Sequence, residues 1–340
     1  MSRLSNLKKV QPKLDHFCYG RGKLLLSGEY FVLDGARALA LPVSVGQSLS
    51  VRYVPSFNPV LYWKSFDSDD NLWFQTSFEF WHFDCLEENP DKEVLFLQKI
   101  LRQARKQNSH FLRDEVDVFV ETRLEFPLDW GLGSSSTLIH NVANWAYISP
   151  FELLFNVYGG SGYDVAVAQS ECPIVYEKDG SVPKWSLGSF DPPFRNNLYF
   201  VHLDRKQNSM DAIEHYNCKK PHDKKIIEAL SGITEKMEKA NTLFEFECMM
   251  KEHEEIISKT LELQRARDKF FSDYWGEIKS LGAWGGDFVL ASSDRNFEET
   301  RKYFAGKGFN VVIPYEQLVL NNNEDDFVNQ GPIERFKYLH

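Results

Sequence analysis

The spacing of hydrophobic and polar positions predicts both strands and helices in the first third of the chain. Segment 115–124 alternates valines with charged neighbours, which is the two-residue period of a half-buried strand. The aromatic and β-branched segments 59–65 and 72–84 predict further strands. In 91–106, apolar residues instead recur at helical spacing and basic residues close the segment, so we expect a helix there.

Glycine-bearing turns interrupt this pattern at two places. Strand-like segments 24–26 and 30–33 flank Ser27-Gly28-Glu29, and Asp34-Gly35 is typical of a hairpin turn. Farther along, a Gly/Ser-rich turn at 131–136 precedes the apolar stretch 137–148, which predicts a buried helix.

The second half of the chain is richer in helical spacing. Segment 186–197, with two prolines and a glycine, is the expected linker. Helical periodicity dominates 222–279, and the remaining predictions are strands at 198–204, 286–292 and 309–313 and a helix at 296–306. Strands gathered early and helices late indicate an α+β fold with two domains, residues 1–190 and 191–340.

Composition narrows the function classes. The 340-residue chain is 43% hydrophobic with a net charge of -10, so it lacks the overall basic character of a nucleic-acid binder, and no nucleic-acid partner is expected. No run approaches the ~20 apolar residues of a membrane span, and the first residues lack a signal-peptide core, which predicts a cytoplasmic protein without a membrane partner. Five scattered cysteines predict reduced thiols.

The strongest candidate chemistry lies in Gly131–Thr137, with the sequence GLGSSST. Closely placed glycines let a backbone approach a ligand, and the following helix adds its positive end, so the segment can cradle an anion. The residues expected to bind nucleotide phosphates are Gly131, Leu132, Gly133, Ser134, Ser135 and Ser136. The segment is not a Walker loop, because its lysine is missing. A Gly/Ser turn that only caps a helix is the alternative.

Two further glycine-rich segments accompany this loop, and their order matters more than any one of them. Gly22–Gly35 has the sequence GKLLLSGEYFVLDG, and Leu281–Phe288 has the sequence LGAWGGDF. Together with Gly131–Thr137 they resemble the three motifs of the GHMP kinase superfamily, which includes galactokinase, homoserine kinase, and the mevalonate and phosphomevalonate kinases. Trp284 and Asp287 depart from the third motif by replacing two small residues.

The resemblance implies the two-domain GHMP kinase fold, with the active site in the cleft between an N-terminal ATP-binding domain and a C-terminal domain. It also implies ATP and Mg²⁺ as cofactors, with Ser135 as a metal ligand. The expected partner is a small-molecule acceptor, and a homodimer stays open.

Asp164 and Lys23 are the catalytic pair that the resemblance implies. Asp164, in Ser161-Gly162-Tyr163-Asp164, matches the catalytic aspartate of mevalonate-type kinases, which accepts the acceptor's hydroxyl proton or orients it. Lys23 matches the lysine beside that aspartate, whose charge keeps a carboxylate ionised and stabilises the transferring group. The alternatives are a helix N-cap for Asp164 and a solvated strand lysine for Lys23.

Weaker candidates complete the predicted site. Glu152 lies upstream of Asp164, where some mevalonate kinases have a second Mg²⁺ ligand; a solvated helix position is the alternative. The residues expected near the acceptor are Glu29, Tyr30, Ser161, Gly162, Lys206, Gly282, Ala283 and Trp284. A plain polar loop is the alternative for Lys206. Lys251–Glu255 contains a His-Glu pair without the second histidine of a zinc-protease motif, and is expected to be a solvated helix face.

The resemblance therefore favours an ATP-dependent small-molecule kinase that transfers the γ-phosphate directly to mevalonate or phosphomevalonate. Two alternatives stay open. One is diphosphomevalonate decarboxylase, against which Lys23 counts, because the opening motif of that enzyme lacks this lysine. The other is a non-catalytic GHMP-fold sensor of a nucleotide or metabolite, which the substitutions at Trp284 and Asp287 keep open.

Overall fold

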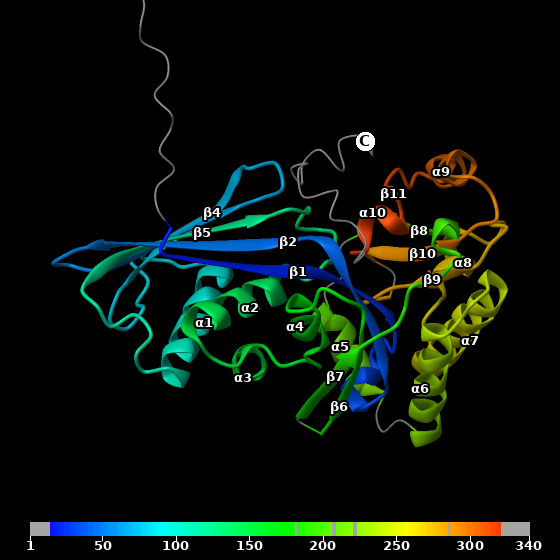
Figure 1. Cartoon of the computed structure of the whole chain (residues 1–340), viewed down its shortest axis with the longest axis horizontal. Coiled ribbons are helices and arrows are strands. Elements are labelled where there is room, and N and C mark those ends of the chain that lie inside the picture. The colour runs from blue at the N-terminus through cyan, green and yellow to red at the C-terminus, as the bar shows by residue number, and fades with distance from the viewer. Residues whose placement is uncertain (1–13, 181, 206–208, 220–222, 285, 321–340) are drawn as a thin grey trace, which may run out of the picture.

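Two β-sheets with helices packed on them organise the chain (Figure 1). The structure is a computed structural model, which describes residues 14–180, 182–205, 209–219, 223–284 and 286–320. The first sheet comes from residues 16–187 and the second from residues 198–314, so the two sheets lie on either side of the predicted boundary at residue 190. The mixed architecture confirms the predicted fold class.

The first sheet is built around one long strand. Its strands are β1 (His16–Ser27), β2 (Ala38–Pro55), β3 (Val60–Phe66), β4 (Leu72–Glu79), β5 (Val116–Leu124), β6 (Ile174–Asp179) and β7 (Val182–Leu187). The order is β4-β3-β5-β2-β6-β7, with β1 paired to β2. The β3–β5 pair is parallel and the other pairs are antiparallel. β2 thus fixes β1, which carries the first motif, against the rest of the sheet.

Four helices cover one face of this sheet (Figure 1). They are α1 (Lys92–Gln107), α2 (Ser134–Ala146), α3 (Pro150–Val157) and α4 (Tyr163–Ala168). The Asp91 side chain caps α1 by accepting a hydrogen bond from the backbone N–H of Val94 at 2.8 Å. The buried residues of α1 recur at helical spacing and pack with α2, β3 and β5 in one hydrophobic core.

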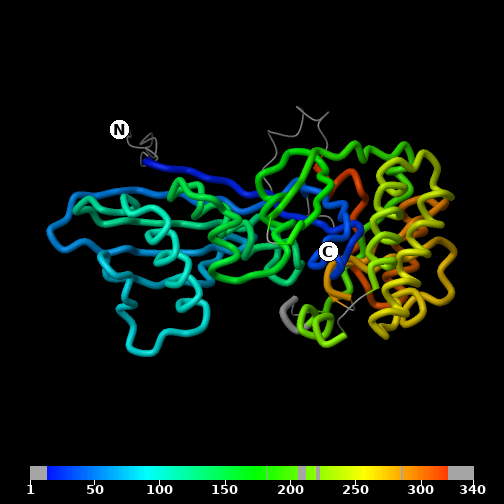
Figure 2. The backbone as a smooth tube through the Cα atoms, turned by 90° about the horizontal axis from the view of Figure 1, so that it is seen from below, coloured from blue at the N-terminus to red at the C-terminus, as the bar shows by residue number. Residues whose placement is uncertain are grey.

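The second sheet is smaller and antiparallel throughout. Its strands are β8 (Leu198–His202), β9 (Ile278–Ser280), β10 (Phe288–Ser292) and β11 (Val312–Pro314), in the order β11-β8-β10-β9. The helices of this half are α5 (Ser209–Cys218), α6 (Lys224–Glu238), α7 (Leu243–Leu261), α8 (Ala266–Phe270), α9 (Phe297–Gly306) and α10 (Tyr315–Leu318). Figure 2 shows α6 and α7, in yellow, at the opposite end of the molecule from the cyan α1.

One hydrophobic core joins the two sheets. Leu24 and Leu41 of the first sheet belong to the same buried cluster as Phe200 and Leu290 of the second. Just after α10, the chain returns to the first sheet, where Val319 bridges to a residue of β2. β1 carries the start of the first motif, and β10 begins where the third motif ends. The shared core therefore fixes these two motifs relative to one another.

Most of the predicted elements are confirmed, and one early strand is wrong. Segments 59–65, 91–106 and 115–124 match β3, α1 and β5. Residues 30–33, however, lie mostly in the 3₁₀ helix η1 (Phe31–Asp34) instead of a strand. The flanking Gly28 and Gly35 have φ of 86° and 93°, so the chain turns sharply on both sides of this segment. Within the described part of the chain, every helix is too short or too polar to cross a membrane.

Candidate active site

The predicted phosphate loop folds as a tight turn into α2. Gly131 and Gly133 have left-handed φ of 63° and 90°, conformations that favour glycine. Gly133 is the N-cap of α2, and no side chain caps the first turn of this helix. The first N–H groups of α2 are thus available to a ligand, and the positive end of the helix favours an anion.

The three serines of this loop face different surroundings. Ser134 and Ser135 line a cavity at the start of α2, and Ser135 is exposed. Ser136 is buried, and its hydroxyl donates a hydrogen bond to Oδ2 of Asp164 at 2.5 Å. The loop is therefore joined directly to the predicted catalytic aspartate, through a contact that the sequence did not reveal.

Lys23 projects from β1 toward the same loop. The β1–β2 register shifts between Arg21 and Lys23, and a side chain on the intervening Gly22 would lie 2.7 Å from Val43, so the strand is deformed at a glycine. Nζ of Lys23 donates to the carbonyl of Gly131 at 2.8 Å. This contact with the loop does not fit the alternative of a solvated strand lysine.

The charge of Lys23 is maintained by its neighbours. Burial alone would lower the pKa of Lys23, but Tyr163, Asp164 and Asp287 outweigh this effect, and the net pKa is raised. The ammonium group also lies 5.8 Å from the centroid of the Tyr163 ring. A lysine that stays protonated can stabilise negative charge on a phosphoryl group.

Asp164 lies in the first turn of α4. The N-cap of this helix is Gly162, with a left-handed φ of 92°, so Asp164 is not the N-cap, and that alternative is wrong. Oδ1 of Asp164 accepts the N–H of Val165 at 3.0 Å, and Oδ2 accepts the hydroxyl of Ser136. Both oxygens are thereby oriented by groups that belong to rigid elements.

A cavity of about 80 Å³ adjoins Lys23 and the third motif. It is lined by Lys23, Leu25, Tyr30, Val32, Leu33, Ser161, Tyr163, Ala212, Ile213, Gly282, Ala283 and Asp287. Four residues predicted near the acceptor are in this lining: Tyr30, Ser161, Gly282 and Ala283. Tyr163 and the two α5 residues of the lining, Ala212 and Ile213, were not among the predicted site residues. Gly282 has open space where a side chain would begin, so its backbone can approach a ligand.

The remaining predicted site residues lie elsewhere. Trp284 is buried in a hydrophobic cluster instead of facing this cavity. Gly162 packs against Phe151 and other aromatic side chains outside the cavity lining. Glu152 is exposed on α3, and no contact among the described residues joins it to Ser135 or Asp164. Lys206 lies outside the described residues.

Comparisons with known proteins identify the fold of the chain. No protein-family model and no curated protein sequence matches the chain. A solved mevalonate kinase of Methanococcus jannaschii is similar at 15% identity and a TM-score of 0.66, over 92% of this chain and 100% of that one. Streptococcus pneumoniae phosphomevalonate kinase, in complex with phosphomevalonate and AMPPNP, is similar at 13% identity and a TM-score of 0.66, over 87% and 99%. Lactococcus lactis galactokinase, complexed with galactose, is similar at 13% identity and a TM-score of 0.60, over 86% and 90%.

The chain has the GHMP kinase fold. In this GHMP fold, a second cavity of about 130 Å³ opens beside Ser134 and Ser135. Its apolar and aromatic lining comes from Trp63, Trp73, Phe74, Phe96, Leu97, Leu124, Leu128 and Leu138. Gln47, Ser65, Thr122 and Glu93 are the other polar or charged residues in the lining. An apolar wall with a small number of polar groups is typical of a pocket for a small organic molecule.

A separate set of ionisable residues is buried, and we call Glu29, His253, Glu254 and Lys279 the Glu29 cluster. Lys279 donates to a carboxylate oxygen of Glu29 and, at 3.0 Å, to the carbonyl of Ser280. Nε2 of His253 accepts the N–H of Gly28 at 3.1 Å and lies 3.2 Å from Oε2 of Glu29. Burial and the charge of Lys279 lower the pKa of His253 well below its usual value, so the ring is neutral.

This cluster bears on two predictions. Glu29 is fully buried and does not line the cavity, so the structure does not bring it to the predicted acceptor contact. His253 and Glu254 are also buried, so the predicted solvated face of Lys251–Glu255 is wrong at these two positions. Burial of such charged groups requires partners, and those partners come from segments far apart in the sequence.

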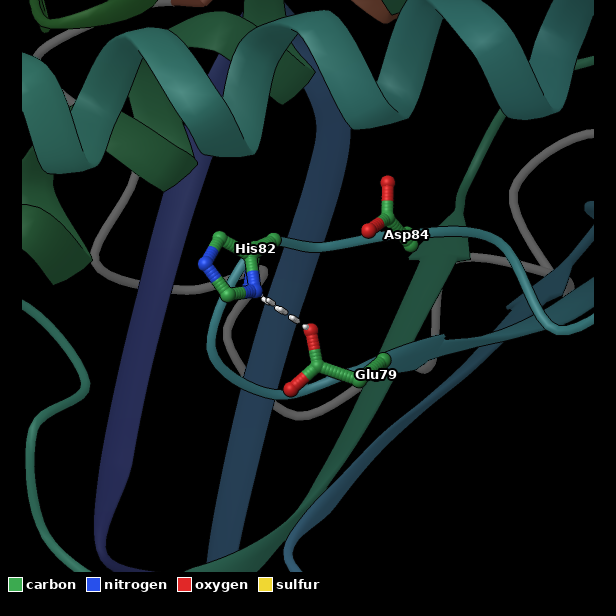
Figure 3. A group of neighbouring side chains, drawn as sticks. All are labelled: Glu79, His82 and Asp84. Atoms are coloured by element: carbon green, nitrogen blue, oxygen red, sulfur yellow. Dashed lines mark hydrogen bonds and ion pairs between the residues drawn. The ribbon is translucent and has the colours of Figure 1, made fainter.

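Glu79, His82 and Asp84 lie together at the end of β4 and in the turn that follows, and they have the residue types of a metal site. Figure 3 shows Glu79, His82 and Asp84 together beneath a helix, with Nδ1 of His82 lying 3.4 Å from Glu79. Glu79 already accepts the backbone N–H groups of Trp81 and His82, at 2.6 and 2.7 Å. Asp84 is paired with Arg102 at 2.6 Å. These bonds explain the group as a folded turn, and it carries no metal-site proposal.

Proposed function

We propose that the chain is an ATP-dependent kinase that phosphorylates a small metabolite. The observation that carries this proposal is the convergence of Lys23, Ser136 and Asp164 at a glycine loop whose helix N-terminus favours an anion. Phosphoryl transfer depends chiefly on positioning and charge stabilisation, and these residues supply both. The similarity to mevalonate, phosphomevalonate and galactose kinases supports the same reaction class.

The loop residues suit a nucleotide and its metal. A side chain on Gly133 would approach Lys23 to 3.1 Å, so glycine keeps the loop and the lysine close together. The hydroxyl of Ser135 and the carboxylate of Asp164 are oxygen donors of the kind that Mg²⁺ prefers. When bound, Mg·ATP supplies the phosphoryl group that is transferred. The aromatic cavity beside Ser134 and Ser135 is the proposed site of the base.

The chain's own residues then act on the acceptor and on the developing charge. Asp164 orients the acceptor hydroxyl and receives its proton as the oxygen bonds to the γ-phosphorus. The bond from that phosphorus to the bridging oxygen breaks, and ADP leaves with the electron pair. Lys23 stabilises the charge on the transferring group. Ser136 holds Asp164 in position through its hydrogen bond.

Mevalonate or phosphomevalonate is the proposed acceptor class. The acceptor-side cavity, which is the one lined by Lys23 and Gly282, is small, and Leu25, Val32, Leu33, Ala212 and Ile213 give it an apolar wall. Lys23 and Asp287 add one cation and one carboxylate to the lining. A short branched carbon skeleton with an acidic group matches this combination better than a sugar, which is hydroxylated on most carbons. On the sequence grounds above, we place the enzyme in the cytoplasm and divide it near residue 190.

A coupled ADP-release assay with Mg·ATP tests the proposal. Mevalonate, phosphomevalonate, galactose and homoserine would be offered separately, and we expect turnover with one of the first two. Turnover with galactose or homoserine would keep the kinase and overturn the acceptor class. Carbon dioxide release from diphosphomevalonate would identify the decarboxylase alternative. ATP binding without turnover in any assay would contradict the kinase proposal and favour a sensor.

A further inference from the structure

Asp287 stands at an unusual backbone position in the third motif. Its φ is 49°, in the left-handed region that glycine adopts more easily than any residue with a side chain. The position is firmly held, because its N–H donates to the carbonyl of Arg205 at 2.9 Å and its carbonyl accepts the N–H of Leu203 at 2.7 Å. Backbone strain of this kind is retained where the surrounding structure or function requires it.

The carboxylate of Asp287 lies against the phosphate loop. A Cβ atom built on Gly131 would lie 2.2 Å from Oδ2 of Asp287 and 2.3 Å from its Cγ, distances that contacts of real Cβ atoms do not reach. The absence of a side chain at Gly131 is therefore what allows this aspartate to reach the loop. The contact joins the second and third glycine-rich motifs directly.

Lys23 is the third member of this contact. Its ammonium group donates to the carbonyl of Gly131, the residue that Asp287 touches. Lys23 and Asp287 also line the same acceptor-side cavity. The charge of Asp287 contributes, after Tyr163 and Asp164, to the raised pKa of Lys23. Lys23 is thus influenced by two carboxylates, one from α4 and one from the third motif.

We propose that Asp287 is a positioning residue, which holds Gly131 and Lys23 in the arrangement needed for phosphoryl transfer. The proposal rests on the proposed kinase function. It gives a role to an aspartate that stands where the backbone conformation favours glycine. It also gives the third motif a defined task, which is to fix the phosphate loop by a side chain rather than by backbone alone.

Two variants separate the charge from the backbone strain. Asp287→Asn keeps the shape of the side chain, and Asp287→Gly relieves the left-handed conformation. We expect both to lower kcat by about 10- to 100-fold, the scale of a small misplacement at a reacting centre, with a smaller change in the acceptor KM. Asp287→Gly should nevertheless melt no lower than the wild type. Asp287→Asn should also move the alkaline limb of the kcat profile to lower pH, because Lys23 loses one of the charges that raise its pKa.

Asp70 provides the matched control. It has a φ of 63° and is exposed in the turn after β3, where it pairs with Arg123. Asp70→Asn and Asp70→Gly should leave kcat and its pH profile unchanged. Wild-type kcat and an unshifted profile for Asp287→Asn would overturn the proposal.

A third measurement needs no turnover. Gly131→Ala should lower the melting temperature strongly in the wild type and by clearly less in the Asp287→Gly protein, where the colliding carboxylate is absent. Equal losses in the two backgrounds would refute the contact and the proposal with it. If the wild type turned over no acceptor, the kinase function would be refuted. The difference between the two Gly131→Ala melting losses would still test the contact between Asp287 and Gly131.

Discussion

The phosphate-loop site and the Glu29 cluster each contain one lysine and two carboxylates, yet they are built for different tasks. Lys23 is partly buried, donates to one backbone carbonyl and faces a cavity. Lys279 is fully buried and donates both to Glu29 and to a carbonyl. Both lysines carry the same charge, so charge alone does not separate their roles. Lys23 is accessible from a cavity and donates to one backbone carbonyl, which suits a group that meets a ligand. Lys279 is inaccessible and already has two partners, which suits a group that stabilises the fold.

The two regions are also connected in space. Glu29 immediately precedes Tyr30, and Lys279 lies shortly before Gly282 and Ala283, so each partner of the buried ion pair adjoins a wall of the acceptor-side cavity. The Tyr30 hydroxyl accepts the backbone N–H of Trp284 at 3.0 Å and joins the same two walls again. The buried cluster therefore supports the phosphate-loop site by fixing the geometry of its walls.

The largest expected effect comes from removing the positive charge of Lys23 at the phosphate-loop site, which we also call the open site because it faces a cavity. Lys23→Met should lower kcat by about 10³-fold or more, because stabilisation of the transferring group is lost while the fold is kept. Steady-state kinetics with Mg·ATP and a melting curve would measure the two quantities together. If Lys23→Met had the wild-type kcat, or lost activity only because it unfolds, Lys23 would not differ from Lys279 in the way proposed.

Removing the other lysine should act on stability instead. Lys279→Met leaves Glu29 buried without its ammonium partner, and we expect a loss of about 3–5 kcal/mol in the free energy of unfolding, measured by denaturant titration. The double variant Glu29→Gln/Lys279→Met should recover part of that loss, because no unpaired charge remains. If Lys279→Met were as stable as the wild type, the Glu29 cluster would not be the structural clamp inferred here.

The sequence predicted the open site better than the buried one, for a physical reason. The glycine loop was predictable because its backbone geometry requires local glycines, such as Gly133, whereas Lys23 was assigned from the resemblance of its segment to the first GHMP motif. Glu29 and Lys279 are 250 residues apart, and nothing in the local pattern of either reports the other. The pairing of Glu29 depends on how the two sheets pack, so the local sequence could not predict it.

Short elements set another limit on the sequence analysis. α4 has six residues and α3 has eight, which is too few for a helical period to be recognised. The motif located Asp164, but the contact between Asp164 and Ser136 depends on how α2 and α4 pack. Likewise, the left-handed conformation of Asp287 could be suspected only from its place in a glycine run.

The Glu29 cluster should also make stability depend on pH. Burial raises the pKa of Glu254 to about 8, with Glu29 adding to the rise and Lys279 opposing it. Because the folded pKa lies above the unfolded value, the folded state favours the protonated acid, and the stabilisation is lost as pH rises toward about 8. The slope should approach ~1.4 kcal/mol per pH unit. Denaturant titrations of the wild type and of Glu254→Gln between pH 4.5, the ordinary pKa of a glutamate, and about pH 8 would measure how the free energy of unfolding changes with pH. The same pH dependence in both proteins would contradict the assignment of this effect to Glu254.

The smallest expected effects distinguish Ser136, which orients the proposed catalytic aspartate, from Glu152, which lies outside the site. Ser136→Ala removes the hydroxyl that holds Oδ2 of Asp164, and we expect kcat to fall by about 10-fold, because a single orienting hydrogen bond is worth roughly 1.5 kcal/mol when its acceptor is charged. Glu152→Gln changes an exposed carboxylate on α3 and should leave kcat and the Mg²⁺ dependence unchanged. If instead Glu152→Gln raised the Mg²⁺ requirement, α3 would have to approach the phosphate loop in the working enzyme, and the boundary of the open site would extend beyond the residues that this structure brings together.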